Sequence, residues 1–344
     1  FFFATMPALD PFWRGVLIAY ACVAAWMTSS GAVVLHNKWL MTVFNFSYPA
    51  TMTMMHMSFS FIVAFIIIRV LKLVPRPEIT NRQIWGAIFP IGACYSIVLV
   101  CSNYAYVYLT VAFIQMLKAS LPVLVFFVSV AFGVAKFESQ LLWTILVISV
   151  GVIVVTEGQV DMSFMGLVLQ GVSLVFESVR LVMIEVLLKK QGITLNPITT
   201  LYYVAPVTLC CILAPAAIFE FQDLGKILGM VTGNPFTFLF NCSLAFLLNL
   251  AVFLIIGKTS ALTMNIAGIS KDVIVIAIST VLFAAPLYAK SCFGFVIVII
   301  GVALYNYKKY KISMEDGKSK SQELDVAPMK DSDEDANSGS PANK

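Results

Sequence analysis

The chain has 344 residues, of which 60% are hydrophobic and only 12% are charged. Soluble domains carry about 25% charged residues, so this composition excludes an ordinary water-facing surface and leaves a lipid-facing one. The formal net charge of +4 comes from basic residues scattered over short loops, which excludes a nucleic-acid-binding face.

The sequence predicts an all-α membrane protein with ten transmembrane helices. A window of about 20 predominantly apolar residues is long enough to cross a bilayer as a helix. Such windows lie near residues 14–36, 48–73, 84–107, 110–134, 140–157, 163–188, 197–219, 236–257, 260–284 and 288–310. Because the number is even, both termini are expected on the same side, with residues 1–13 as a short cytosolic segment.

The distribution of Lys and Arg over the short loops predicts which side that is. Cytosolic loops carry an excess of these residues. One side collects twelve of them: Arg14, Arg69, Lys72, Arg76, Arg82, Lys136, Lys189, Lys190, Lys258, Lys308, Lys309 and Lys311. The other side has three, Lys38, Lys226 and Lys290. We therefore expect both termini in the cytosol.

Related pieces recur about 150 residues apart and indicate two halves of five spans, residues 14–157 and 158–311. Asn103-Tyr-Ala precedes Thr110-Val-Ala, and Asn249-Leu-Ala precedes Thr259-Ser-Ala. Five spans per half give opposite orientations, hence an inverted repeat, which places a substrate site near the midplane. After Lys311 the composition becomes polar and acid-rich, so residues 312–344 are expected to be a disordered tail.

Five ionisable residues fall well inside the predicted spans: Lys118, Glu177, Arg180, Lys271 and Asp272. At roughly 2.5–3.5 kcal/mol for each charge at a helix centre, the set would cost on the order of 10 kcal/mol if it faced lipid. These side chains must therefore face one another or a watery cavity.

Lys118 is the first candidate for a substrate contact. Pro122, four residues later, cannot donate to the Lys118 carbonyl, so the fourth span should be kinked with a freed carbonyl beside a cation. The structural alternatives are a Lys that snorkels to the interface or one that pairs with Glu177.

Lys271 and Asp272 are the second candidate group. A polar stripe of small residues at helical spacing, with Lys271 on its flank, is formed by Asn265, Gly268, Asp272 and Ser279. The alternative is that Lys271 and Asp272 only offset each other's charge. Glu177 and Arg180, three residues apart, are interpreted as a structural ion pair.

No enzyme motif is visible: the sequence has no G-x-S-x-G elbow, no H-E-x-x-H pair and no P-loop. The seven cysteines lie in apolar runs without a C-x-x-C pair, and His56 is interpreted as a satisfied core histidine. No cofactor and no metal site are therefore expected.

Six segments in order make the chain resemble the nucleotide-sugar and triose-phosphate translocator family of the drug/metabolite transporter superfamily. The resemblance covers residues 14–310 and is carried by NKWL, YPATMTMMHMSFSF, FIQMLKASLPV, FESVRLVMIEVLL, LNPITTLYYVAP and LNLAVFLIIGKTSALTMNIAGISKDV. It implies ten helices in two inverted halves and exchange of phosphorylated solutes by alternating access.

The resemblance also implies roles for particular residues. The family's plastid members hold phosphate with a Lys in the fourth span and a Lys-Arg pair in the ninth, which correspond to Lys118 and to Lys271-Asp272 here. Because Asp replaces Arg, the chain is similar to the Golgi or ER subgroup. Asn103, Gln115 and Tyr202, which lie in the recurring or family-like segments, complete the predicted substrate-binding set.

Our expectation from sequence is thus a Golgi or ER antiporter that exchanges a nucleotide sugar for a nucleoside monophosphate, embedded in the bilayer and without a nucleic-acid partner. The first alternative is a sugar-phosphate or phosphoenolpyruvate exchanger against phosphate, for which a plastid envelope is one location. The second is a membrane scaffold that transports nothing. A homodimer is compatible with each of these.

Overall fold

The computed structural model describes residues 11–74, 86, 88–159, 163–191, 197–256, 261–285 and 287–326. Side chains are described within these ranges from Tyr20 to Ile312, except at 185, 187–191, 197, 252–256 and 261–266. The regular elements of the described ranges are all helical, which confirms the predicted class.

The helices follow the predicted spans closely. The first part of the chain forms α1 (Pro11–Thr42), α2 (Pro49–Phe65) with its π-helical continuation η2 (Ile66–Val70), α4 (Phe89–Tyr108), α5 (Val111–Lys118), α6 (Leu121–Ala131) and α7 (Ser139–Glu157). The second part forms α8 (Phe164–Gln191), α9 (Pro197–Phe219), the short 3-10 turn η4 (Phe221–Asp223), α10 (Leu224–Gly233), α11 (Pro235–Ile256), α12 (Ala261–Leu282) and α13 (Ala289–Val326).

Among the described residues, seven helices or continuous helix pairs are long and apolar enough to cross a membrane. An eighth is added if η4 and α10 count as one span with α11, to which they lie at 90°. The structure therefore supports a protein with several membrane spans, and the number ten remains an expectation.

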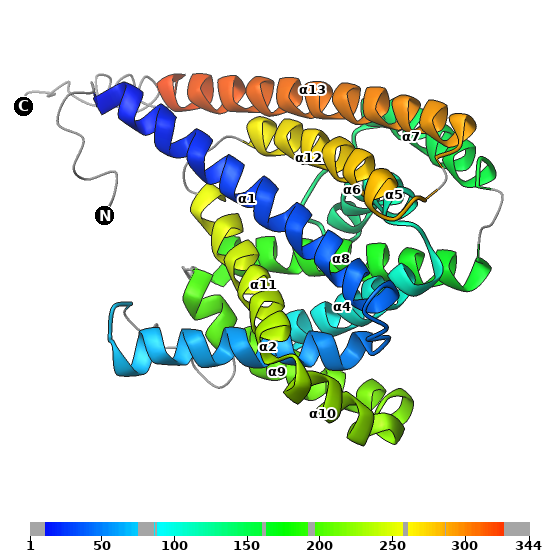
Figure 1. The fold of residues 1–344 in the computed structure, drawn as a ribbon. Coiled ribbons are helices and arrows are strands. Elements are labelled where there is room, and N and C mark those ends of the chain that lie inside the picture. The colour runs from blue at the N-terminus through cyan, green and yellow to red at the C-terminus, as the bar shows by residue number, and fades with distance from the viewer. Residues whose placement is uncertain are drawn as a thin grey trace, which may run out of the picture.

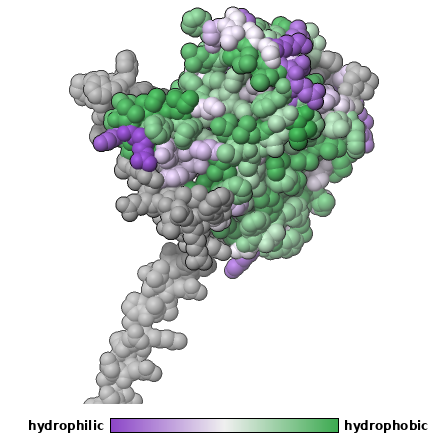
Figure 2. All heavy atoms as spheres, turned by 90° about the horizontal axis from the view of Figure 1, so that it is seen from below, coloured by the Kyte–Doolittle hydropathy of each residue, from purple (hydrophilic) through white to green (hydrophobic). Residues whose placement is uncertain are grey.

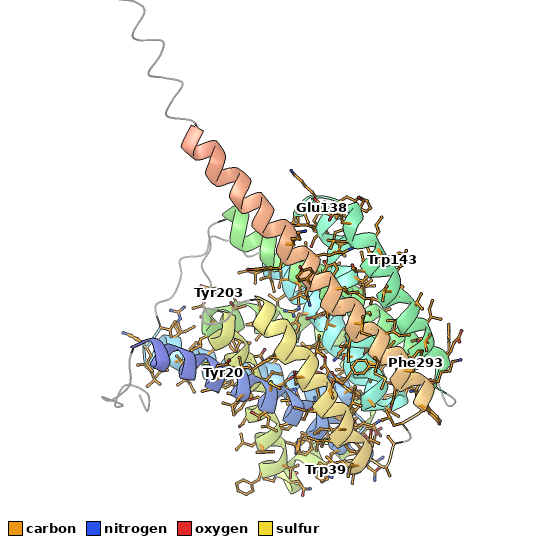
Figure 3. All side chains as sticks on the ribbon, turned by 90° about the horizontal axis from the view of Figure 1, so that it is seen from above. Tyr20, Trp39, Glu138, Trp143, Tyr203 and Phe293 are labelled. Carbon is orange, nitrogen blue, oxygen red and sulfur yellow. The ribbon has the colours of Figure 1, made fainter. Side chains whose placement is uncertain are left out.

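The outer surface is apolar in the way that a lipid-facing surface requires. Figure 2 shows one face on which hydrophobic residues dominate and hydrophilic residues are confined to patches near its edges. Trp143 and Phe293 are about two-thirds exposed and lie on the outer side of α7 and α13 (Figure 3). Large apolar side chains exposed over a whole surface are a burden in water and favourable in a bilayer.

The helices pack in a set of long antiparallel and crossing pairs (Figure 1). Helix α1 packs against α11 and α12, α4 packs against α8 and α9, and α2 packs against α9 and α11. Helix α5 packs against α12, and α7 packs along α13.

Glycines bring α7 and α13 into backbone contact. A Cβ atom placed on Gly294 would lie 2.5 Å from the Val155 nitrogen, and one on Gly151 would lie 2.8 Å from the Val298 nitrogen. Small residues that allow such approach are the usual basis of helix pairing in membranes, where the hydrophobic effect does not drive association.

A buried carboxylate caps the beginning of α2. The two Glu220 carboxylate oxygens accept hydrogen bonds from the Ala50 nitrogen (2.8 Å) and the Thr51 nitrogen (2.7 Å), and the Tyr104 hydroxyl donates to the same carboxylate at 2.7 Å. A carboxylate at a helix N-terminus accepts hydrogen bonds from the free backbone amides, and its negative charge interacts favourably with the positive end of the helix dipole. This contact joins the end of α9 to the start of α2.

Helix α13 corrects the expected boundary of the tail. It continues without a break from the apolar span, past Lys311, to Val326, whereas the sequence predicted disorder from residue 312. Adding residues to an existing helix needs no new nucleation, so even a polar segment with Ser, Asp and Gly among its Glu, Lys and Gln residues can extend it. Residues from 327 onwards lie outside the described ranges.

Candidate functional site

Lys118 lies at a break between two helices in the interior. Helix α5 starts at the cap Thr110, whose hydroxyl accepts a hydrogen bond from the Phe113 nitrogen (3.2 Å), and ends at Lys118. Helix α6 begins at Leu121, with Pro122 in its first turn. The break coincides with the kink predicted from Pro122, and the free carbonyls at the end of α5 favour a cation there.

The Lys118 ammonium lies 5.6 Å from the centroid of the Tyr106 ring. Tyr106 belongs to α4 and is buried, and its hydroxyl accepts a hydrogen bond from Gln115 Nε2 at 3.3 Å. The aromatic face holds the cation without neutralising it. Lys118 therefore has a defined position and keeps its charge for another partner.

Lys271 and Asp272 lie together on α12. The Lys271 ammonium is 2.8 Å from Asp272 Oδ1, and each side chain is about one-sixth exposed, at 16% and 15%. The contact is ionic, since Oδ1 accepts no directed hydrogen bond in the described part of the structure. The Lys271 ammonium also lies 5.7 Å from the ring centroid of Trp26 on α1.

These two groups meet because α5 packs against α12, close to α1 (Figure 1). Asp272 lies within electrostatic range of Lys118 as well as of Lys271. Two cations and one carboxylate thus share one largely buried region and leave it with a net charge of one positive unit. Such a region attracts an anion more strongly than the same charges would in water.

The other predicted substrate contacts are placed differently. Gln115 joins the site through Tyr106, as described above. Asn103 Nδ2 donates to Thr53 Oγ1 at 2.9 Å in a buried contact between α4 and α2. The Tyr202 hydroxyl accepts from Arg69 Nε at 3.3 Å, and its ring stacks on Phe65, which forms a separate cluster at the end of α2. The backbone of Asn265 lies in α12, and its side chain is outside the described residues.

Glu177 and Arg180 form the ion pair that their spacing suggests. Arg180 Nη2 lies 2.6 Å from Glu177 Oε1, and Nε lies 3.2 Å from Oε2. The guanidinium group also stacks over the Tyr95 ring, 4.6 Å from its centroid. Glu177 and the Tyr95 ring hold Arg180 in place between α8 and α4. In the described part of the structure Glu177 therefore pairs with Arg180 and not with Lys118.

Both histidines of the chain meet at one amide, a cluster that the sequence did not suggest. His56 Nε2 contacts Asn241 Oδ1, and Asn241 Nδ2 donates to His36 Nδ1 and to Asn37 Oδ1, both at 2.8 Å. The cluster joins α1, α2 and α11. It satisfies His56 by hydrogen bonding, in agreement with the core interpretation.

Sequence reasoning missed Trp26 and Tyr106, which position the two lysines. Neither residue stands at a helical spacing from the lysine that it contacts, because Trp26 and Lys271 are brought together only by the packing of α1 on α12. Aromatic residues are also common in membrane spans, so their type carries little information alone.

Comparisons with known proteins identify the family of the chain. Residues 17–306 match the Triose-phosphate Transporter family over most of the chain. The chain belongs to the Triose-phosphate Transporter family. One relative in Arabidopsis thaliana, named a probable sugar phosphate/phosphate translocator, is 40% identical over 318 residues, 91% of this chain and 90% of the relative. A second protein of that name from the same plant is 40% identical over 316 residues, again 91% and 90% of the two chains.

A more distant Arabidopsis thaliana protein with the same printed name is 28% identical over 303 residues, which cover 86% of this chain and 97% of the relative. Membership of this family, together with the long apolar helices, supports the expectation of an integral membrane transporter. The names of these relatives favour the alternative that we set beside nucleotide-sugar exchange, and they do not support the nucleotide-sugar subgroup.

Proposed function

We propose that this protein exchanges a sugar phosphate for inorganic phosphate across an intracellular membrane. The observation that supports this proposal most strongly is the largely buried group of Lys118, Lys271 and Asp272, in which two cations outnumber one carboxylate. Phosphate groups carry close to two negative charges at neutral pH, and a pair of lysines offers them several donors. The printed names of the relatives supply the substrate class.

Lysine suits a carrier because the bound solute has to leave again. Lys is a hydrated point charge on a flexible stem, whereas Arg holds phosphate in a bidentate clamp. Asp272 reduces the net charge further by pairing with Lys271. The site therefore combines attraction for an anion with a weakened hold on it.

The nucleotide-sugar reading remains as the second candidate, because Asp272 stands where the plastid carriers of the resemblance have Arg. A carboxylate accepts hydrogen bonds from sugar or ribose hydroxyls, which a larger ligand offers. One residue supports the nucleotide-sugar hypothesis, whereas the sugar-phosphate hypothesis also agrees with the printed names of the relatives.

The architecture that goes with this function is ten spans in two inverted halves. The seven candidate spans, the bent pair with α11, α1 and α12 add up to ten. Exchanging the halves turns the contact of α1 with α11 into that of α8 with α4, and leaves the pairs α5–α12 and α7–α13 unchanged. Any two-fold relation between the halves has this property, and five spans per half make the relation an inverted one, in which we expect Lys118 and Lys271 near the midplane.

The count of basic residues in the loops supports both termini in the cytosol. The membrane that we propose is that of the Golgi or ER or a plastid envelope. Protease treatment of sealed, cytosol-side-out vesicles tests the orientation. The tail after Val326 should be cleaved, and its protection would reverse the topology.

A counter-exchange screen tests the function. Purified protein is reconstituted into liposomes that are preloaded with inorganic phosphate, and uptake of labelled triose, pentose and hexose phosphates is compared with uptake of nucleotide sugars. The proposal predicts that at least one sugar phosphate exchanges for phosphate. Exchange of nucleotide sugars against nucleoside monophosphates, without any sugar-phosphate exchange, would establish the second candidate instead.

A further inference from the structure

Gln170 on α8 has a buried carboxamide that nothing satisfies. The side chain is fully buried, and neither Oε1 nor Nε2 has a hydrogen-bond partner within the described part of the chain. Among the buried residues that the structure describes, Gln170 is the one whose two polar side-chain atoms both lack a hydrogen-bond partner. A buried amide without partners costs several kcal/mol in an apolar interior, so a partner from outside the described residues, such as a substrate hydroxyl or a water, is expected there.

The position of Gln170 follows from its neighbours on the same helix face. Gly166, four residues earlier, packs on Leu109, the residue that follows α4, and a Cβ atom there would lie 2.6 Å from the Leu109 side chain. Ser173, three residues later, donates to the Val98 carbonyl oxygen at 3.2 Å. Residues at these spacings share one side of a helix. Gln170 therefore lies against α4 between Val98 and Leu109.

The same stretch of α4 carries the residue that positions Lys118. Tyr106 lies between Val98 and Leu109, and its ring holds the Lys118 ammonium. Lys118 in turn lies within electrostatic range of Asp272. One segment of α4 is thus flanked by the phosphate-binding candidate on α5 and by the unsatisfied amide on α8, and both α5 and α6 also pack on α8.

We propose that Gln170 is a specificity-determining residue that binds the hydroxyl groups of the organic part of the substrate. A carboxamide donates through Nε2 and accepts through Oε1, so it pairs with a hydroxyl that donates and accepts at once. An inorganic phosphate offers no second part that could reach from Lys118 to α8, whereas a sugar phosphate does. This inference rests on the proposed function and assigns the recognition of its sugar portion.

Replacing Gln170 by Met tests the assignment, because Met has the same unbranched length and needs no hydrogen bond. The measurement is the KM for the sugar phosphate that the wild type exchanges best and the KM for inorganic phosphate, in reconstituted liposomes. We expect the ratio of the KM for the sugar phosphate to the KM for inorganic phosphate to rise about five- to tenfold, because one or two neutral hydrogen bonds to the sugar phosphate are lost. Ser173→Ala, one turn away on the same face, is the matched control and should keep the wild-type ratio.

A buried water is the other source of a hydroxyl for this amide. If Gln170 only holds such a water, Gln170→Met leaves the ratio at the wild-type value and changes the melting temperature alone, and the assignment is overturned. If Gln170→Met is not recovered folded, Gln170→Asn, which keeps the amide on a shorter side chain, must raise the ratio or the assignment fails. A wild type that exchanges no sugar phosphate would remove the proposed function, and this inference with it.

Discussion

At the scale of single residues, the two candidate phosphate-binding lysines are held in similar ways. Lys118 lies over the Tyr106 ring and Lys271 lies over the Trp26 ring, at 5.6 and 5.7 Å. A cation–π contact contributes about 0.5–2 kcal/mol, less than a charge-assisted contact with phosphate. The rings can therefore orient both ammonium groups and give them up to a substrate. The two lysines differ in their contact with Asp272, which forms an ion pair with Lys271 and not with Lys118.

Asp272→Asn tests what the carboxylate does. If it offsets Lys271, its neutralisation frees one positive charge, and the concentration of inorganic phosphate that half-inhibits sugar-phosphate uptake should fall about three- to tenfold. The measurement is competition in reconstituted liposomes, with Asp272→Ala as the companion variant. Both variants should behave alike under this account. A graded loss of uptake, partial in Asn and nearly complete in Ala, would show instead that Asp272 accepts hydrogen bonds from the substrate.

At the scale of helices, breaks and close contacts matter more than helix propensity. The interruption between α5 and α6 could be predicted, because Pro122 removes a hydrogen bond wherever the helix packs. The cap of α2 by Glu220 could not, because the two are joined only when α9 reaches α2. The same holds for Asn241, whose partners lie more than 180 residues away in the sequence. Local rules predict local features, and tertiary contacts override them.

The α7–α13 contact gives the clearest stability prediction. Gly294→Ala puts a methyl group 2.5 Å from the Val155 backbone nitrogen, so the two helices must separate. We expect destabilisation by about 1–3 kcal/mol, measured as a lower melting temperature of the detergent-solubilised protein. Gly171→Ala on α8 is the control, since nothing lies within 4 Å of a Cβ atom there. Equal melting temperatures for the two variants would contradict the backbone contact.

At the scale of the whole molecule, the class and the span positions followed from composition and window length, because the bilayer imposes both. The candidate site was predicted in part. Lys118, Lys271 and Asp272 stood out as charges in apolar spans, and the structure brings them together. Tyr202 did not join them, because α9 carries it to Arg69. Trp26 and Tyr106 required the packing of separate helices to become visible, and so did the lack of hydrogen-bond partners for the Gln170 amide within the described residues.

The central claim is that Lys118 and Lys271 together bind the phosphate group. It is tested most directly by phosphate/phosphate exchange in liposomes, which involves no sugar at all. Lys118→Ala and Lys271→Ala should each reduce the exchange rate by at least about tenfold, since a charge-assisted contact of about 1.5–3 kcal/mol is lost. Lys290→Ala, which removes an exposed partner of Glu157, should leave the rate unchanged. Wild-type exchange in both interior variants, with the proteins folded and correctly inserted, would contradict the account.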